Sequence, residues 1–380
     1  MATYKTPGVY VKETGRNPPA FDGQPTSIPA FIGYAGPDAI SNISPVKILS
    51  FSEFANRFGN EGGEKFLHES IDLFYKNGGN ECYIIPVGNI HDPVSFSAFL
   101  AGLEASKPLP VQLLVMPDAS LLPEPDFYSL QKQALAAAAV LHDRFVILDT
   151  VHPSGNCKTD QDTFRAGIGN DNLKWGAAYY PWLKPGNGSA VPPSGAVAGV
   201  YAMTDQTRGV WKAPANVSLS GVTDLTNHIT NEEQETMNMP VDGKAINALR
   251  LFPGKGILIW GGRTLDGNCM DWRYVSVRRT ITFIEQSIQK GAGWVVFEPN
   301  DAHTWAALKA MIENFLLGLW RQGALAGAKP EEAFTVHIGL GTSMTAVDIL
   351  EGILRVFVNV AVSRPAEFIV IAFQFQTRKS

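Results

Sequence analysis

Apolar and polar residues alternate with a period of two near the end of the chain, which predicts a β-strand over residues 366–376. One face of this strand would carry Ile369, Ile371, Phe373 and Phe375. The other face would carry Phe368, Val370 and Ala372, followed by Gln374 and Gln376. The strand runs almost to Ser380 with no hairpin turn after it, so the nearby sequence offers it no partner.

A short extended run near the other end covers residues 10–13, and Val9, Tyr10 and Val11 supply its apolar side chains. The turn-rich segment 15–29 separates this run from the first globular segment. We expect both arms to pair with a sheet, because an unpaired apolar edge favours aggregation. One solution is that each arm adds a strand to another copy of the same chain.

Strands and helices alternate between the two arms, which predicts the α/β fold class. In the first part of the chain the pattern predicts strands at 30–34, 82–87, 111–116 and 145–148, with helices at 52–58, 63–77 and around 130–141. In the final third it predicts strands at 256–260, 294–297, 333–338 and 353–362, with helices at 271–290, from a cap at Asn300 or Asp301, and at 345–351.

The middle of the chain is less regular than either end. Residues 150–195 are rich in Gly, Pro, Asn and Asp and contain one predicted strand at 177–180, and residues 216–243 are polar and loop-like. We therefore expect an inner α/β domain built from residues 30–95 and 251–364, and an inserted outer α/β domain at 96–250. Residues 1–29 and 365–380 would form the two arms.

Composition narrows the class of protein. Hydrophobic residues make up 45% of the chain and charged residues 18%, and the net charge of −5 argues against a nucleic-acid partner. The three cysteines fit neither a disulfide framework nor a zinc site, which favours folding in a reducing compartment. We expect no secretory signal, because the N-terminus lacks a basic segment followed by an apolar one. We expect no membrane insertion, because no apolar run is long enough to cross a bilayer.

One motif suggests a hydrolase. The segment around Ser343 resembles the nucleophile motif of subtilisin-like proteases, and residues 148–150 resemble their aspartate strand. None of the seven histidines lies in a setting that would supply the general base, so Ser343 or Thr345 is better explained as a helix cap. A cryptic serine hydrolase that uses Ser343 stays as an alternative.

Other candidate chemistry is weaker still. The glycines at 254–256 and 261–262 lack phosphate-loop spacing, and Asp160, Asp162 and Asp171 lack the spacing of a calcium loop. Arg278 and Arg279 beside Glu285 are expected on a helix surface. We therefore assign no catalytic residue, cofactor or metal, and we do not expect an enzyme.

Several segments together resemble the contractile tail sheath proteins. In the first part these are TPGVYVKE at 6–13, IPAFIGY at 28–34 and FYKNGGNECY at 74–83. In the last third they are RYVSVRR at 273–279, FIEQSI at 283–288, WVVFEPN at 294–300, NFLLGLWRQGALAG at 314–327 and RPAEF at 364–368. The short length and the last third are most similar to sheaths of antifeeding-prophage-like extracellular injection systems.

This resemblance implies a structural subunit that polymerises as helical rings around an inner tube and contracts to drive the tube through a target envelope. Partners would be further copies of the chain, related sheath copies, the tube protein, the baseplate and a terminal cap. A helix near the C-terminus would touch the tube, with Thr345, Asp348 and Glu351 at the matching place. Assembly would take place in the cytoplasm, and the phage tail-like particle would be released from the cell. A non-contractile ring or adaptor protein is the other alternative.

Overall fold

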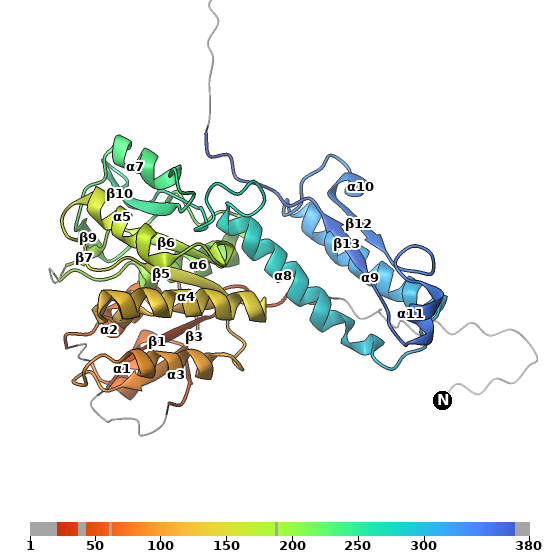
Figure 1. Cartoon of the computed structure of the whole chain (residues 1–380), viewed down its shortest axis with the longest axis horizontal. Coiled ribbons are helices and arrows are strands. Elements are labelled where there is room, and N and C mark those ends of the chain that lie inside the picture. The colour runs from red at the N-terminus through yellow and green to blue at the C-terminus, as the bar shows by residue number, and fades with distance from the viewer. Residues whose placement is uncertain (1–20, 37–42, 61–62, 187–188, 369–380) are drawn as a thin grey trace, which may run out of the picture.

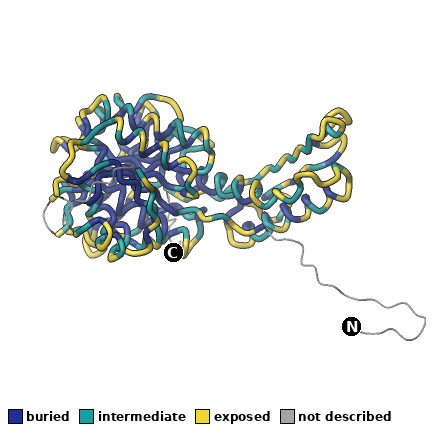
Figure 2. The backbone as a smooth tube through the Cα atoms, turned by 90° about the horizontal axis from the view of Figure 1, so that it is seen from below, coloured by how far each residue is buried: buried dark blue, intermediate teal, exposed yellow. Residues whose placement is uncertain are grey.

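The computed structural model describes residues 21–36, 43–60, 63–186 and 189–368, which form two lobes joined by one long helix (Figure 1). The large lobe contains most of the buried residues, and the small lobe is thin and mostly half-buried or exposed (Figure 2). Strands and helices alternate through the large lobe, which confirms the α/β class.

A nine-stranded mixed sheet forms the centre of the large lobe. Its strands, in spatial order, are β2 (Val46–Ile48), β3 (Cys82–Gly88), β1 (Pro29–Tyr34), β4 (Leu113–Val115), β5 (Phe145–Asp149), β6 (Gly176–Tyr180), β10 (Ile246–Phe252), β11 (Gly256–Ile259) and β8 (Val217–Ser218). The six strands from β3 to β10 are parallel, and β2, β11 and β8 run antiparallel to their neighbours.

Helices cover both faces of this sheet, as in a doubly wound fold. One face packs on α3 (Phe96–Ser106), α4 (Glu124–Leu141) and α5 (Cys157–Ile168). The other face packs on α1 (Phe51–Phe58), α2 (Leu67–Lys76) and α6 (Ser194–Arg208). Successive β1 side chains point to opposite faces, so Ala30 and Ile32 belong to the first core and Phe31 to the second.

The irregular middle segments contain more structure than their composition predicts. Residues 150–195 include α5 and the 3₁₀ turn η2 (Leu173–Trp175). The segment expected to be loop-like contains β8, α7 (Asn231–Asn238) and β9 (Val222–Leu225), which pairs with β7 (Leu183–Pro185). The loop prediction was wrong for α7, because a capping box between Thr230 and Glu233 begins a helix whose only buried residue is Met237.

The small lobe is a helical layer with a two-stranded sheet. It comprises the end of α8 (Val275–Gly291), η3 (Ala292–Val295), α9 (Ala302–Arg321), α10 (Pro330–Ala333), β12 (Phe334–His337), α11 (Ala346–Leu350) and β13 (Phe357–Val360). Asp301, one of the two caps that the sequence predicted, caps α9 by accepting hydrogen bonds from His303 and Thr304. The lobe has its own core, in which Leu308, Ile312 and Leu316 of α9 are buried.

One predicted strand of the small lobe was wrong, and another was too long. Residues 294–297 lie in η3 and the turn after it, because a short apolar run cannot distinguish a strand from a helical turn. Phe297 then has a positive φ of 70°. The predicted strand 353–362 shortens to β13, whose partner β12 has only four residues.

The structure groups the predicted domains differently. β1 lies between β3 and β4, so residues 30–95 and 96–250 share one sheet instead of forming separate domains. The second half of the predicted inner domain, after β11, mostly builds the small lobe. The reason is long-range parallel pairing, which the order of elements along the chain does not specify.

Candidate assembly interface at the roots of the two arms

The N-terminal arm begins beside α8 and is held there by a buried ion pair. Arg279 donates to both carboxylate oxygens of Asp205, at 3.0 and 2.5 Å, and to the carbonyl oxygen of Thr26 at 2.9 Å. The Thr26 hydroxyl donates to the same carboxylate at 2.6 Å. The two charged side chains are 3% and 4% exposed, and the guanidinium stacks on the Tyr201 ring. We call this group the Arg279–Asp205 clamp.

Further contacts continue along α8 towards the small lobe. The Gln24 backbone donates to Ser287 at 3.1 Å, and Lys290 donates to the Gln24 side chain at 2.8 Å. Phe21 enters the small-lobe core. Its ring lies against Gly291, where an added Cβ would be only 1.6 Å from the nearest ring atom. The packing of the Phe21 ring therefore leaves room only for glycine at this position, and the described part of the arm is held as far as Phe21.

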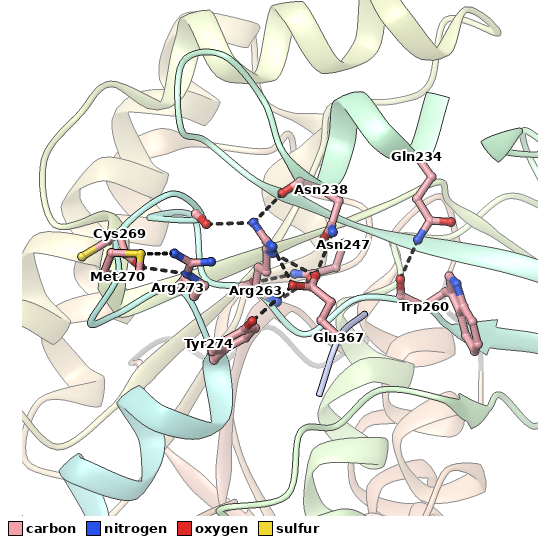
Figure 3. Close-up of polar contacts among 11 residues, drawn as sticks. Gln234, Asn238, Asn247, Trp260, Arg263, Cys269, Met270, Arg273, Tyr274 and Glu367 are labelled. Atoms are coloured by element: carbon pink, nitrogen blue, oxygen red, sulfur yellow. Dashed lines mark hydrogen bonds and ion pairs between the residues drawn. The ribbon is translucent and has the colours of Figure 1, made fainter. Parts of the chain in front are cut away.

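The C-terminal arm begins at a second buried ion pair (Figure 3). Arg263 donates to Glu367 from Nε at 2.9 Å and from Nη2 at 2.6 Å. Asn238 donates to the same carboxylate at 2.7 Å, and the Tyr274 hydroxyl at 3.2 Å. The side chain of Arg263 is 2% exposed and that of Glu367 is 20% exposed. We call this group the Arg263–Glu367 clamp.

The electrostatics of this clamp favour the charged carboxylate. Burial alone would raise the pKa of Glu367, but the hydrogen bonds from Arg263 and Asn238 outweigh it and lower the pKa below the usual range. The remaining guanidinium nitrogen, Nη1, donates to the carbonyl oxygens of Asn238 and Gly267. Every nitrogen of this buried guanidinium therefore has a partner.

Asn247 of β10 connects this clamp to the sheet. Its side-chain oxygen accepts from the backbone N–H of Arg263 at 2.8 Å, and its nitrogen donates to the carbonyl oxygens of Arg263 and Ala178. Because Ala178 lies in β6, the root of the arm is fixed to the centre of the large lobe.

A short segment before Glu367 joins the two lobes. Ser363 donates to the carbonyl oxygens of Ala324 and Gly323 in the small lobe. Arg364 donates to the carbonyl oxygen of Met270 at 2.8 Å, and Glu367 then reaches Arg263. The C-terminal arm is thus held on both lobes before it leaves the body of the subunit.

The predicted strand residues lie almost entirely beyond these roots. Phe368 is the first residue after the clamp, and it is 66% exposed. The others fall outside the described residues: Val9, Tyr10, Val11, Ile369, Val370, Ile371, Phe373 and Phe375. Their pairing in a neighbouring copy stays a prediction.

The predicted tube-contact residues lie together at α11. Thr345 and Asp348 cap the helix reciprocally, and Asp348 also accepts two hydrogen bonds from Arg355, at 2.9 and 3.0 Å. The backbone N–H of Thr345, together with Arg355, lowers the pKa of Asp348 to about 2. The Asp348 carboxylate therefore stays charged, and its charge is paired with Arg355 within the lobe. In the helix Ala346, Val347 and Leu350 are exposed, as are the caps Thr345 and Glu351.

The geometry does not support a serine hydrolase. Ser343 donates to the carbonyl oxygen of Arg355 and accepts from the N–H of Gly339, so it stabilises a loop. Asp149 lies in the other lobe, where it accepts from the hydroxyl and backbone N–H of Ser194 and caps α6. The two residues of the resembling motifs are therefore not brought together.

The usual ligand crevice of a doubly wound sheet is filled by the protein itself. That crevice lies where the strand order reverses, here between β1 and β4. Asp118, in the 3₁₀ turn η1 (Pro117–Leu121) after β4, accepts from the N–H groups of Tyr34, Phe66 and Leu67. A carboxylate thus takes the place of an anionic ligand at the start of α2.

The structure corrects the expected position of two arginines. Arg278 and Arg279 were expected on a helix surface, but both are buried, because α8 passes between the lobes. Arg278 stacks between the rings of Trp175 and Trp272, 4.4 Å from each ring centre.

Within the described ranges no cluster of three or more acidic, His or Cys side chains is suited to a metal ion. No helix there has the length and hydropathy needed to cross a membrane.

Neither clamp was found from the sequence. Glu367 gave the only local signal, because it is the sole charged residue within the apolar run 365–373. Its partner Arg263 lies 104 positions earlier, in a glycine-rich turn. Asp205 and Arg279 are 74 positions apart, on separate helices.

Comparisons with known proteins divide the chain close to the boundary between the two lobes. The phage tail sheath protein central domain matches residues 97–265, and the phage tail sheath C-terminal domain matches residues 270–376. The boundary between them falls just before α8, where the small lobe begins.

Solved structures match the whole chain. The sheath complex of the extracellular contractile injection system PVC, in its contracted state, is 32% identical, with a TM-score of 0.80 and coverage of 98% of both chains. The contracted helical sheath of the anti-feeding prophage is 33% identical, with a TM-score of 0.79, and covers 98% of this chain and 99% of that chain.

Curated relatives match over shorter stretches. The tail sheath protein of Vibrio phage KVP40 is 26% identical over 45% of this chain and 22% of its own length. A putative prophage major tail sheath protein of Pseudomonas aeruginosa is 29% identical over 28% of this chain and 27% of its own length. The matches thus span about a quarter of these relatives. All these proteins are structural sheath proteins, a family not known for enzymes, and the chain belongs to the contractile tail sheath family.

Proposed function

We propose that this chain is the sheath subunit of a contractile injection machine. Copies stack as helical rings around an inner tube, between a baseplate and a terminal cap, and contraction drives the tube through a target envelope. Assembly takes place in the cytoplasm, and the phage tail-like particle is then released. The observation that carries this proposal is the pair of clamps, because each holds the root of an apolar arm whose strand has no partner within its own sequence neighbourhood.

The sheet β12–β13 is the acceptor that we propose for the arms. Among the described strands, β12 and β13 pair only with each other, so each has an open edge. A two-stranded sheet is marginally stable alone and gains from added strands. Phe357 at the start of β13 is 54% exposed, which gives an incoming strand an apolar contact. An arm from a neighbouring copy would extend this sheet by main-chain hydrogen bonds.

The clamps explain how a neighbour stays attached while the sheath changes shape. An exchanged strand transmits force only if the arm is fixed where it leaves its own subunit. The Arg263–Glu367 clamp passes that force to β6 and β10 through Asn247, and the Arg279–Asp205 clamp passes it to α6 and α8. Both roots are thus tied to the large lobe by buried charges.

Contraction would replace weak contacts with the tube by larger contacts between sheath subunits. We propose that α11 touches the tube. Since Asp348 is paired with Arg355, Glu351 would supply the ionic contact, together with exposed Val347 and Leu350. An exposed ion pair contributes about 0–1 kcal/mol, so such a contact breaks readily. Burial of apolar surface between subunits at about 25 cal/mol per Å² would then accumulate over many copies.

Negative-stain electron microscopy tests this function on the purified protein, alone and co-expressed with its genomic neighbours. Hollow cylinders in long and short forms are the expected result. Single rings of fixed height would instead indicate the non-contractile adaptor. Monomers under both conditions would contradict assembly, and labelling of Ser343 by a fluorophosphonate probe would then test the hydrolase alternative.

A further inference from the structure

A groove opens immediately beyond the Arg263–Glu367 clamp, between α7 and the paired strands β10 and β11. It has a volume of about 600 Å³. Its lining includes Met239, Arg250 and Trp260, together with Phe368 from the arm itself. The first residue of the arm after the clamp therefore already lies in this groove.

Two large apolar side chains of the groove are exposed, although most of its lining is polar. Met239 is 60% exposed and Trp260 is 36% exposed. Large apolar side chains exposed together on one surface mark an interaction site. Phe368 alone does not cover these residues, since it is itself 66% exposed.

Hydrogen bonds hold the walls of the groove in place. Arg250 donates to Asn231 at 2.9 Å and to Gln234 at 2.6 Å, which fixes α7 on β10. Gln234 donates to the carbonyl oxygen of Trp260 at 2.9 Å (Figure 3). The Trp260 ring packs against Phe252, with 4.6 Å between ring centres. The surface is thus formed before any partner arrives.

We propose that this groove holds residues 369–376 of the same chain while the subunit is free, and releases them when a neighbouring copy takes the arm. The inference rests on the proposed strand exchange. The clamp fixes where the arm starts, and Phe368 directs it into the groove. Eight extended residues reach about 26 Å, enough to follow the groove along α7.

Two physical arguments favour the chain's own arm as the occupant. A tethered segment has a high effective concentration at its own groove, whereas a neighbour's arm must first find it. The charges also agree, because Glu235 lines the groove, Glu232 and Glu233 lie on the same helix, and the end of the arm carries Arg378 and Lys379. Docking would cover an apolar strand that otherwise favours aggregation of free subunits.

Cysteine cross-linking of the full-length free subunit tests this proposal. Cys269 is first changed to Ser, because Cys82 and Cys157 are buried and Cys269 is only half-buried. Glu235→Cys lines the groove, and Val370→Cys lies on the same strand face as Phe368. A short bismaleimide should link these two positions within one chain, as read by mass spectrometry. The matched control pairs Val370→Cys with Leu49→Cys, an exposed position on another edge of the large lobe, and should give no link.

A second variant, Met239→Ser with Trp260→Ser, checks the groove without a cross-link. Chymotrypsin should cleave the freed arm after Phe373 several-fold faster than in the unaltered subunit. Equal cleavage rates, no link in monomers, or a link only between different chains in polymers would each overturn self-docking. These measurements use unassembled protein, so a chain that never polymerises would contradict the proposed sheath function and still answer this question.

Discussion

Arg263 and Glu367 lie 104 positions apart in the sequence and form a two-pronged ion pair at 2.6 and 2.9 Å. The contact joins the turn after β11 to the last described residues of the chain, and it is made where the arm leaves the large lobe. Arg279 and Asp205 form the equivalent pair for the other arm. Each arm thus starts from a buried charge pair that also belongs to the folded body.

The first prediction concerns the stability supplied by the Arg263–Glu367 clamp. Glu367→Ala leaves a guanidinium that is 2% exposed without its carboxylate, and a broken buried pair costs about 3–5 kcal/mol. Because Glu367 is 20% exposed and water can enter, we expect a loss of about 2–4 kcal/mol in the free energy of unfolding, measured by urea denaturation. Glu351→Ala, an exposed carboxylate on α11, is the control and should change stability by less than about 0.5 kcal/mol. An equal effect of both variants would contradict the clamp's role.

The second prediction separates the clamp from the arm beyond it. A chain truncated after Phe368 keeps Glu367 and loses only the docked arm, so it should unfold at a higher urea concentration than a chain that also lacks the clamp. A chain truncated after Ala366 also loses the clamp, and it should show the instability of Glu367→Ala. Equal stability of the two truncated chains would show that Glu367 contributes nothing to the fold.

The third prediction concerns the N-terminal root. Gly291→Ala should destabilise the small lobe by about 1–3 kcal/mol, because its new methyl group overlaps the Phe21 ring. Phe21→Ala should remove most of that penalty, so a double-mutant cycle measured by thermal unfolding should give a large coupling energy. Gly318→Ala in α9 meets no atom within 4 Å and is the control. Additive effects of the Gly291 and Phe21 changes would show that the two residues do not meet.

The fourth prediction is a pH dependence from two buried carboxyl groups. Burial raises the pKa of Asp149 to about 7 and that of Asp118 to about 6, from an ordinary value of 3.8. The folded chain therefore binds these protons more tightly than the unfolded chain. Their contribution to stability is complete below pH 3.8 and is lost as the pH rises through 6 and 7.

Asp149→Asn isolates the larger of these two effects. Between pH 5 and pH 7, an interval set by the shift of Asp149, the parent should lose stability more steeply than the variant. The difference should be at most about 1.4 kcal/mol per pH unit in the free energy of unfolding. Since the two proteins share every other ionisable group, the effects of those groups cancel. Parallel pH curves would contradict a protonated Asp149.

Local sequence patterns predicted several elements correctly, and long-range pairing accounts for most of the failures. The strand at 30–34 and a helix cap at Asn300 or Asp301 were predicted from local features, and the structure confirms the strand as β1 and gives the cap as Asp301. The order of strands was not predictable, because β1 pairs with β4, more than 80 positions away by the register of Pro29 with Leu113. Residues 294–297 failed for a different reason, since four apolar residues fit a strand and a 3₁₀ turn equally well.

The candidate interface also contains features that were predicted from local patterns and features that were missed. The arms were predicted from periodicity, and they remain predictions because most of their residues lie outside the described chain. The clamps that hold them were missed, because an Arg and a Glu at large separation have no shared local pattern. Asp348 stays a predicted tube contact. Its pairing with Arg355, seven positions later, was not predicted.

The most direct measurement compares the full-length chain with the chain truncated after Phe368, each co-expressed with the genomic neighbours and imaged by negative-stain electron microscopy. Circular dichroism of both purified proteins establishes that each is folded. The full-length chain should form long hollow cylinders, whereas the truncated chain should remain a folded monomer. Cylinders of sheath length from the truncated chain would contradict the exchange of the C-terminal arm.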